Sequence, residues 1–360
     1  MKFAVLLALS LGIAAPALAD PIIVPSETCK AYFFVPVTLP ARDDRPDDRT
    51  LWFLYDTGAS STYVDPDSIE RVSGMRLSSR QRARIDDASI GELSVSMSAR
   101  VTELDHLSMA LGREIDGILA FGAFDDFLLT LDYENAEMRL ETGELPRPDN
   151  ETVFSANGPD SRPWLRVRFE GRTRRMLIDS GAALGVLGVN DLHRYDLMEP
   201  ARPVGASVRF STIEYRDGGR LADPVFLGPH RIETPLVSEV PRTEIIGGEI
   251  MRHFTWTFDQ DNERVRLVPV APGDAMTTPS RPHPGLALRP VANGLEIQSI
   301  LPGSAAVDVD LQPGDVLTHV FGVPMADRGC EMRELDAWTV TRLRDGQSAD
   351  VTFPLVTLVE

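Results

Sequence analysis

The chain has 360 residues, of which 43% are hydrophobic and 25% are charged, and its formal net charge is -18. This is the composition of an ordinary globular protein, and the length allows two or three domains. The acidic balance argues against binding to nucleic acid or anionic lipid, which carry charge of the same sign, and is typical of a surface that resists aggregation.

The first residues are typical of a secretory signal peptide. Lys2 supplies a positive charge, Phe3 to Ala15 form an apolar run too short for a comfortable membrane span, and small residues precede Asp20. We therefore expect residues 1–19 to be a signal peptide and the protein to be periplasmic or secreted, as in bacteria. An uncleaved membrane anchor is the alternative. No later segment is long and apolar enough to span a membrane.

The first half of the chain predicts a series of strands, one of which delivers an aspartate into a loop. Ala31 to Leu39 is rich in Val, Phe and Tyr, and Leu51 to Tyr55 is an apolar run that ends at Asp56. A charged turn, Arg42 to Arg49, separates the two runs. Further strands are expected at Ser89 to Val101, Ile115 to Leu119, Phe127 to Tyr133 and Glu137 to Leu140.

The second half repeats this order. Trp164 to Phe169 and Arg175 to Ile178 are predicted strands, and the second of them ends at Asp179. Further strands are expected at Val204 to Tyr215, Ala222 to Val237, Phe254 to Asp259 and Arg264 to Leu267. Phe127, Thr130 and Asp132 correspond to Phe254, Thr257 and Asp259 at a spacing of roughly 120 residues. The sequence therefore predicts a duplicated all-β lobe, with copies at residues 20–150 and 151–272.

Each half contains one copy of a short motif. Asp56-Thr57-Gly58-Ala59 and Asp179-Ser180-Gly181-Ala182 both follow an apolar run. A single copy would be an ordinary turn after a strand. Because the motif recurs with its surroundings, we predict that Asp56 and Asp179 meet in space and share one proton.

The residues beside the two aspartates suit such a pair. Two carboxyl groups about 3 Å apart cannot both ionise, and together they supply the base and the acid that peptide hydrolysis by water needs. Gly58 and Gly181 have no side chain, so the loops can approach closely. The hydroxyl groups of Thr57 and Ser180 can hydrogen-bond the backbone of the opposite loop.

This constellation resembles the aspartic peptidases, and it is most similar to bacterial retropepsin-like proteins. The resemblance covers Ala31 to Val270 and implies two β-barrel lobes with the active site between them, in a monomer that needs no metal and no cofactor. The family has an apolar-apolar-Gly motif beneath each aspartate loop. Ile245-Ile246-Gly247 matches it, whereas Ile118-Leu119-Ala120 has Ala in place of Gly.

Two further features follow from this resemblance. Ala59 and Ala182 stand where pepsin-like enzymes often have Ser, whose hydroxyl favours an ionised carboxylate, so we expect activity toward about pH 5 to 7. The family also covers its cleft with a hairpin flap, for which the candidates are Arg76 to Gly91 and Val208 to Leu221.

The last part of the chain has a different character. Residues 273–283 lie in a segment rich in Pro, Thr, Ser and Gly and are predicted to be a linker. Residues 284–360 resemble a bacterial PDZ domain, on the strength of Pro302-Gly303-Ser304-Ala305-Ala306 and Leu311-Gln312-Pro313-Gly314-Asp315-Val316-Leu317. The resemblance implies a small α+β domain that adds an extended peptide beside a strand and a helix.

The same resemblance assigns the peptide site of this domain. A loop formed by Gly285, Leu286, Ala287 and Leu288 would receive the C-terminal carboxylate of a peptide. Glu334 to Leu343, which has helical spacing of its apolar residues, would be the groove helix. A domain that only packs against the lobes and binds nothing is the alternative.

Other kinds of site find little support in the sequence. Cys29 and Cys330 are the only cysteines, and in an oxidising compartment they either pair or remain separate thiols. The six His residues are scattered without metal-ligand spacing, and neither a Gly-x-Ser-x-Gly elbow nor a Gly-rich phosphate loop is present. We therefore expect no metal, no cofactor and no nucleic acid.

These features support two main hypotheses. The first is an exported aspartic endopeptidase that acts on protein or peptide substrates, with a PDZ domain that binds a substrate or partner through its C-terminal peptide. The second is a non-catalytic envelope scaffold that binds protein C-termini. A third possibility is that Asp56 and Asp179 pair across a homodimer instead of within one chain.

Overall fold

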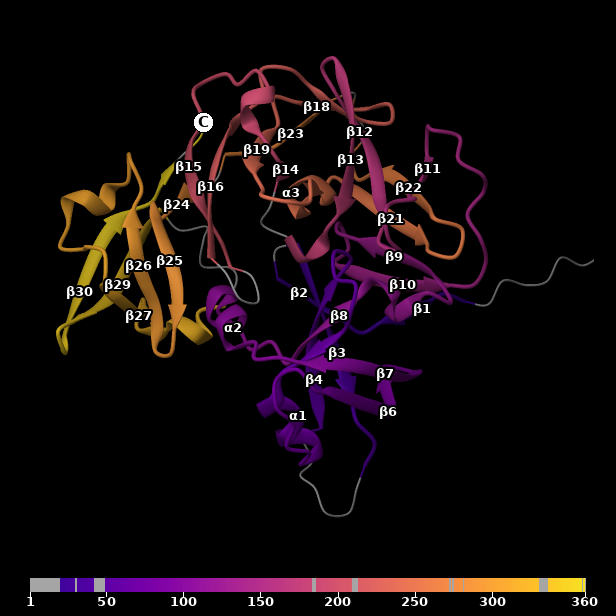
Figure 1. The fold of residues 1–360 in the computed structure, drawn as a ribbon, viewed down its shortest axis with the longest axis horizontal. Helices are drawn as coiled ribbons and strands as arrows, with labels where there is room; N and C mark the ends of the chain where they lie inside the picture. Colours follow the sequence, from indigo (N-terminus) through magenta and orange to yellow (C-terminus); the bar gives the residue numbers. More distant parts are fainter. Residues whose placement is uncertain are drawn as a thin grey trace, which may run out of the picture.

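The computed structural model describes residues 20–29, 31–41, 49–182, 186–208, 213–271, 273, 275–280, 282–329, 336–357 and 359. Strands dominate these residues, and their helices are short (Figure 1), so the predicted all-β class is confirmed for this part of the chain. Within the same ranges, no helix has the length and apolarity needed to cross a bilayer. The predicted signal peptide, residues 1–19, lies outside them.

A seven-stranded sheet, which we call the first lobe, contains Asp56 at the end of a central strand. Its strand order is β2-β3-β4-β8-β5-β7-β6, and two α-helices and a 3-10 turn complete it. The bounds are β2 Glu27–Cys29, β3 Tyr32–Thr38, β4 Thr50–Asp56, β5 Tyr63–Val64, α1 Pro66–Ser73, β6 Arg82–Ile90, β7 Leu93–Val101, α2 Asp105–Leu111, β8 Gly117–Ala120 and η1 Phe121–Phe124.

A ten-stranded sheet, the second lobe, contains Asp179 directly after a central strand. Its order is β15-β16-β19-β14-β20-β13-β12-β17-β18-β23. The bounds are β12 Trp164–Phe169, β13 Arg172–Ile178, η2 Ser180–Ala182, β14 Leu187–Val189, η3 Leu192–Arg194, β15 Arg202–Val208, β16 Ile213–Arg220, β17 Val225–Leu227, β18 His230–Glu233, β19 Leu236–Glu239, β20 Ile245–Ile246, α3 Gly248–Met251 and β23 Ala275–Thr277.

The two lobes share their central topology. The order β3-β4-β8-β5-β7-β6 in the first lobe corresponds strand for strand to β12-β13-β20-β14-β19-β16 in the second. In both, the aspartate strand runs parallel to one short strand, β8 or β20, which in turn pairs antiparallel with the next, β5 or β14. This correspondence is what an internal duplication requires.

A third sheet joins the two lobes, in the order β1-β10-β9-β21-β22-β11. At its centre Thr130 of β9 lies opposite Thr257 of β21, and their hydroxyl oxygens are 3.0 Å apart. Asp132 and Asp259 make the same turn, because each carboxylate accepts hydrogen bonds from the Asn three residues later. The bounds are β1 Ile22–Val24, β9 Leu128–Asp132, β10 Glu137–Glu141, β11 Val153–Ser155, β21 Phe254–Asp259 and β22 Arg264–Pro269.

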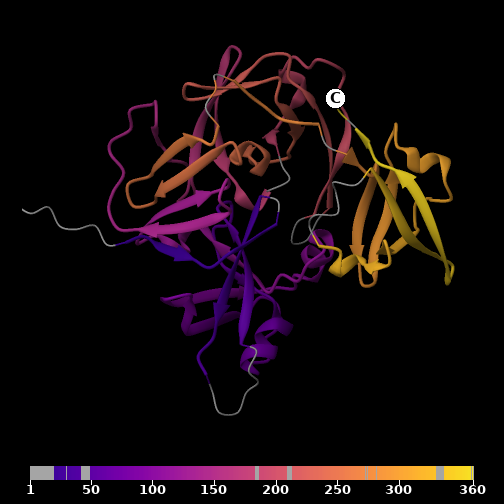
Figure 2. The same ribbon diagram turned by 180° about the vertical axis from the view of Figure 1, so that it is seen from behind.

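The remaining strands form a separate C-terminal domain (residues 282–359), which lies beside both lobes (Figures 1 and 2). Its main sheet has the order β25-β26-β27-β29-β30, and β28 pairs with β27. The bounds are β24 Pro282–His283, β25 Leu286–Val291, β26 Gly294–Ile300, η4 Ala305–Asp308, β27 Val316–Val320, β28 Val323–Pro324, η5 Met325–Asp327, β29 Ala337–Arg344, β30 Gln347–Pro354 and β31 Val356–Thr357.

Two apolar cores correspond to this division. One continuous cluster, including Phe53, Phe124 and Trp256, runs through both lobes and the sheet that joins them. A second cluster, including Ile297 and Trp338, fills the C-terminal domain. Each large apolar side chain contributes about 1.5–3 kcal/mol when it is fully buried. The two lobes therefore share one core, and the C-terminal domain has its own.

The predicted groove helix at Glu334 to Leu343 is wrong from Ala337 onward, where the chain forms β29; residues 334–335 lie outside the described residues. Trp338, Val340 and Arg342 are buried and alternate with partly exposed neighbours. This period of two belongs to a strand and not to a helix. Among the described residues of this domain, the helices are all short 3-10 turns.

The predicted linker is more ordered than its composition indicated. Within residues 273–283, β23 pairs in parallel with β18, and β24 pairs with β31. The buried Thr278 hydroxyl accepts a hydrogen bond from the backbone N–H of Leu236 at 2.9 Å. Of the two alternatives for the cysteines, a disulfide or separate thiols, Cys29 is disulfide-bonded. Cys330 lies outside the described residues.

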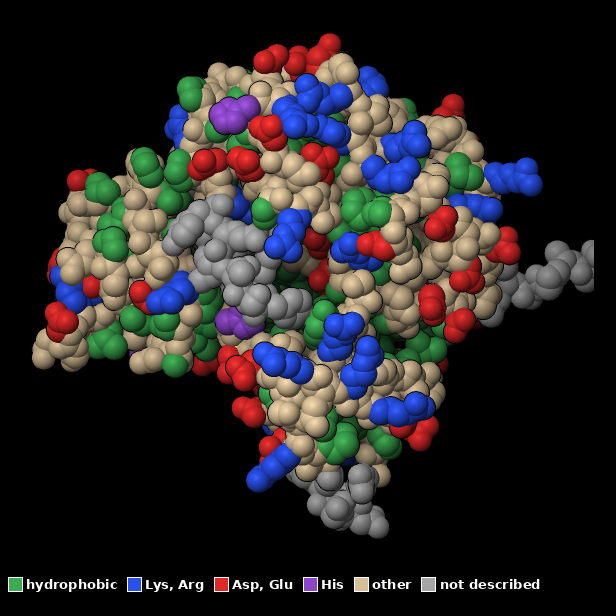
Figure 3. Space-filling view, in the orientation of Figure 1, with side chains coloured by type: hydrophobic (Ala, Val, Ile, Leu, Met, Phe, Trp, Pro, Cys, Tyr) green, Lys and Arg blue, Asp and Glu red, His purple; other side chains and the backbone are tan. Residues whose placement is uncertain are grey.

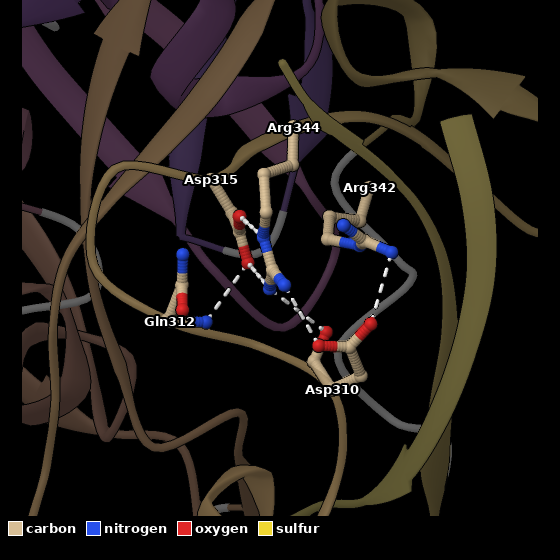
Figure 4. A network of polar contacts seen from close by, with 5 residues as sticks. All are labelled: Asp310, Gln312, Asp315, Arg342 and Arg344. Carbon is tan, nitrogen blue, oxygen red and sulfur yellow. Dashed lines mark hydrogen bonds and ion pairs between the residues drawn. The ribbon is translucent and has the colours of Figure 1, made fainter. Parts of the chain in front are cut away.

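Asp315, in the Pro-Gly-Asp turn of the PDZ-like motif, has a structural role (Figure 4). Its buried carboxylate accepts hydrogen bonds from Arg344 Nε at 2.6 Å, from Arg344 Nη2 at 2.8 Å and from the backbone N–H of Gln312 at 2.8 Å. Burial alone would raise the pKa of Asp315, but the hydrogen bonds from Arg344 and Gln312 and the charges of Arg344 and Arg342 together outweigh it, and the pKa is lowered. Asp310 extends the network by pairing with both Arg342 and Arg344. The turn is thereby tied to β29.

Candidate active site

The two aspartates are brought to the same place by equivalent strands. β4 delivers Asp56 beside Ala120 of the parallel strand β8. β13 ends at Ile178 beside Ile246 of β20, and the backbone N–H of Asp179 donates to the Ile246 carbonyl at 3.0 Å. The buried apolar residues of both strands fix these ends in the core. The two loops of a single chain meet, so the pairing does not require a homodimer.

Thr57 and Ser180 lock the loops together in a reciprocal way. Thr57 Oγ1 donates to the Ile178 carbonyl at 2.8 Å and accepts from the Ser180 backbone N–H at 2.9 Å. Ser180 Oγ donates to the Tyr55 carbonyl at 3.1 Å and accepts from the Thr57 backbone N–H at 3.0 Å. Both side chains are fully buried. The predicted role of the two hydroxyl groups matches these contacts.

Gly58 and Gly181 each face the carboxyl group of the opposite loop. A Cβ atom on Gly58 would lie 2.6 Å from Asp179 Cγ, and one on Gly181 would lie 2.4 Å from Asp56 Cγ. Real Cβ atoms do not approach other atoms so closely. Glycine is therefore required on both sides if the two carboxyl groups are to meet.

The surroundings of Asp56, including the facing Asp179, raise the pKa of its carboxyl group. Burial raises the pKa of Asp56 well above its usual range, and the charge of Asp179 and a hydrogen bond with its side chain raise it further. The backbone N–H groups of Gly58 and Ala59 lower the pKa of Asp56, but they do not offset the increase. Burial, and then the adjacent Asp56, likewise raises the pKa of Tyr55. The arrangement favours a pair that retains one proton while the phenol beside it stays neutral.

The pair lines a cavity of about 860 Å³, within the range of ligand pockets. Figure 3 shows this face of the molecule hollowed where the lobes meet, with acidic side chains inside the hollow. The β15–β16 hairpin borders the cavity through Val204, Gly205 and Arg216. The flap candidate Val208 to Leu221 includes the last residue of β15 and all of β16, and its residues 209–212 lie outside the described residues. The cavity lining includes no residue of β6 or β7, and the first candidate, Arg76 to Gly91, falls on β6.

Arg162 is a site residue that the sequence did not indicate. Its Nη1 donates to the Gly58 carbonyl at 2.9 Å, and it lines the cavity. Asp160 holds the guanidinium through a 2.6 Å contact with Nη2, and the Arg162 hydrogen bond lowers the pKa of Asp160 to about 2. Arg162 lies in a loop before β12, where neither periodicity nor a motif distinguishes it from other surface arginines.

The residues predicted to bind a peptide carboxylate have mixed environments. Gly285 has a φ of 66°, its N–H donates to His283 Nδ1 at 2.8 Å, and its carbonyl accepts from Leu301. Leu286 and Ala287 are buried, and Leu288 is half-buried. Leu286 and Leu288 line the same cavity as the two aspartates. The first N–H group of the expected carboxylate loop is therefore already engaged.

In the part of the chain that the structure describes, no three His, Cys, Asp or Glu side chains are grouped so that they could hold a metal ion. No model of a known protein family and no curated protein matches the chain. The chemistry of the site therefore rests on its own geometry.

Proposed function

We propose that the protein is an aspartic endopeptidase. The observation that carries the proposal is the pairing of Asp56 with Asp179 at the cavity, each carboxyl group against the glycine of the opposite loop. Two lobes of matching strand order, one aspartate loop from each, support a retropepsin-like architecture. The leader-like residues 1–19 support export to the periplasm or beyond.

The paired carboxyl groups suit the hydrolysis of a peptide bond by water. The ionised carboxyl takes a proton from a water molecule while the water oxygen bonds to the peptide carbonyl carbon, and the protonated carboxyl gives its proton to the carbonyl oxygen. The resulting tetrahedral diol collapses as one carboxyl protonates the nitrogen, the C–N bond breaks, and the other carboxyl recovers a hydroxyl proton. The products are a carboxylic acid and an amine, and the pair again holds one proton.

The C-terminal domain fits a PDZ-like module that takes part in substrate binding. Its open sheet, its Pro-Gly-Asp turn and its position beside the cavity support this role. Because the Gly285 N–H is bound to His283, the domain offers less support for a scaffold whose main ligand is a free C-terminal carboxylate.

Digestion of reduced, carboxymethylated lactalbumin tests the proposal. We expect the wild-type protein to cleave this unfolded polypeptide and both Asp56→Asn and Asp179→Asn to slow the cleavage by at least about a hundredfold, because each carboxyl is needed for proton transfer. Asp126→Asn, at an exposed turn position, is the matched control and should keep full activity. Full activity in either dyad variant would overturn the proposal.

A further inference from the structure

The cavity that holds the two aspartates does not end at the two lobes. It continues along α2, where Leu107 and Leu111 line it, and past Val204 of β15. Its far part is lined by the C-terminal domain, through Leu286, Leu288, Pro290, Leu295 and Trp338. Residues nearly 300 positions apart in the sequence thus border one continuous space.

The wall that the C-terminal domain contributes is apolar and includes an unused hydrogen-bond donor. Trp338 is 3% exposed, and its Nε1 has no hydrogen-bond partner within the described residues. A buried donor without a partner costs about 1–3 kcal/mol, and a buried indole N–H usually has one. Because Trp338 lines the cavity, its N–H is a candidate donor to a carbonyl oxygen of a bound chain.

Two sheet edges also meet along this space. β25 is the edge strand of its sheet and pairs with β26, while β15 is the edge strand of the second lobe and pairs with β16. The two edges lie against each other. An edge strand presents unpaired backbone N–H and carbonyl groups, to which an extended polypeptide can add.

The C-terminal domain is fixed in this position by α2 of the first lobe. Arg328 donates to the carbonyl of Met109 at 2.6 Å and also to that of Ala110, so its cation lies at the carboxyl end of the helix. The backbone N–H of Gly329 donates to the Gly112 carbonyl at 2.8 Å. The Met109 side chain packs against the apolar core of the C-terminal domain. The far wall of the cavity is thus attached to the lobe that carries Asp56.

We propose that the C-terminal domain forms a remote subsite of the catalytic cleft, which takes an apolar side chain of an extended polypeptide substrate at some distance from the scissile bond. The apolar side chain packs on Leu288 and Leu295, and Trp338 Nε1–H donates to a backbone carbonyl of the same segment. This inference rests on the proposed endopeptidase function. It differs from binding of a chain terminus, because it selects internal segments of an unfolded chain.

The test compares a long substrate with a short one. The long substrate is reduced, carboxymethylated lactalbumin, and the short one is a fluorogenic peptide of about six residues, which spans roughly 20 Å when extended. Leu288→Ser and Trp338→Phe should each raise KM for the long substrate roughly fivefold, with little change in kcat and no change for the short peptide. Val307→Ser is the matched control, because Val307 is exposed in the same domain and does not line the cavity.

Equal effects of Leu288→Ser on the two substrates, or no effect on either, would overturn the remote subsite. Because Trp338 belongs to the core of its domain, thermal unfolding of each variant is measured alongside, and Leu288→Ser decides the matter if Trp338→Phe does not fold. Binding of dye-labelled carboxymethylated lactalbumin separates this inference from the proposed function. If the wild-type protein binds the labelled chain without cleaving it, and Leu288→Ser weakens this binding, the endopeptidase function is overturned. The polypeptide-binding site is then retained.

Discussion

The two aspartate loops make the same bonds to each other but have different surroundings. Thr57 and Ser180 exchange equivalent pairs of hydrogen bonds, and each loop places its glycine against the opposite carboxyl. Arg162, however, binds the carbonyl of Gly58 in the first loop. Beneath the first loop lies Ala120, where the second half of the chain has glycine.

The contacts that bring the two carboxyl groups together thus differ from the contacts that affect the pKa of Asp56. The shared bonds account for the close approach of the carboxyl groups, and the differences make the two aspartates inequivalent. The Gly58 carbonyl that Arg162 binds belongs to the same peptide unit as the Ala59 N–H, which lowers the pKa of Asp56. Ala120 is accommodated at the end of β8, where its N–H donates to Thr62 Oγ1 at 3.3 Å.

The largest effect should come from breaking the close approach. We expect Gly58→Ala and Gly181→Ala each to lower kcat by about a hundredfold or more, because the new Cβ forces the opposite carboxyl away and misplaces the reacting groups. Gly122→Ala is the control, since a Cβ there meets no atom within 4 Å. Steady-state cleavage of the same unfolded substrate measures the effect. Near-normal kcat in both loop variants would mean that the glycines do not set the distance.

The reciprocal lock predicts a smaller and symmetric effect on stability. Thr57→Val removes the partner of the Ile178 carbonyl and of the Ser180 N–H. Ser180→Ala removes the partner of the Tyr55 carbonyl and of the Thr57 N–H. Because buried polar groups lose their partners in both variants, each should lower the free energy of unfolding by about 1–3 kcal/mol.

Urea unfolding followed by circular dichroism measures this loss. The control, Thr173→Val at an exposed position of β13, should change the free energy of unfolding by less than about 0.5 kcal/mol. If only one of the two variants lowered the free energy of unfolding, the hydrogen bonds between the loops would not be reciprocal in their effect on stability.

The smallest effect should come from removing Arg162, which contacts the first of the two aspartate loops. Arg162→Ala weakens the Ala59 N–H as a donor to Asp56, because the peptide unit is no longer polarised by the guanidinium. The pKa of Asp56, which is already raised, should then rise further. Because this is the proton that the working pair retains, the alkaline limb of the pH–rate profile should move to higher pH, with less than about a tenfold loss of kcat. Arg166→Ala, exposed on β12, is the control. An alkaline limb that does not shift would contradict the positioning role of Arg162.

The repeated parts of the site could be predicted from the sequence, and the contributions of distant segments could not. Asp56 and Asp179 follow apolar strands in both halves, so local pattern and repetition identify them together. Trp338 was assigned to a helix because its neighbours also fit a helical spacing, and the sheet pairing of β29 overrides that pattern. Arg162 acts through a contact with a residue more than 100 positions away, and only tertiary packing brings the two together.

The cavity, too, could be predicted from the sequence only in part. Its end at the two aspartates follows from the two motifs, whereas its far wall depends on α2 packing against β25 of another domain. The composition of the predicted linker did not reveal part of this arrangement. Its residues form β23, which pairs with β18 of the second lobe, and β24, which pairs with β31 of the C-terminal domain. Composition identifies such a segment but does not show what it pairs with.

The most direct test of the central claim is an NMR titration of the aspartate carboxyl carbons in protein labelled with ¹³C-aspartate. The signals lost in Asp56→Asn and Asp179→Asn assign the pair. We predict that one proton leaves the pair well above the ordinary aspartate pKa of about 3.9, because burial and the facing charge oppose full ionisation. Two independent titrations, both near the ordinary value, would contradict the shared proton.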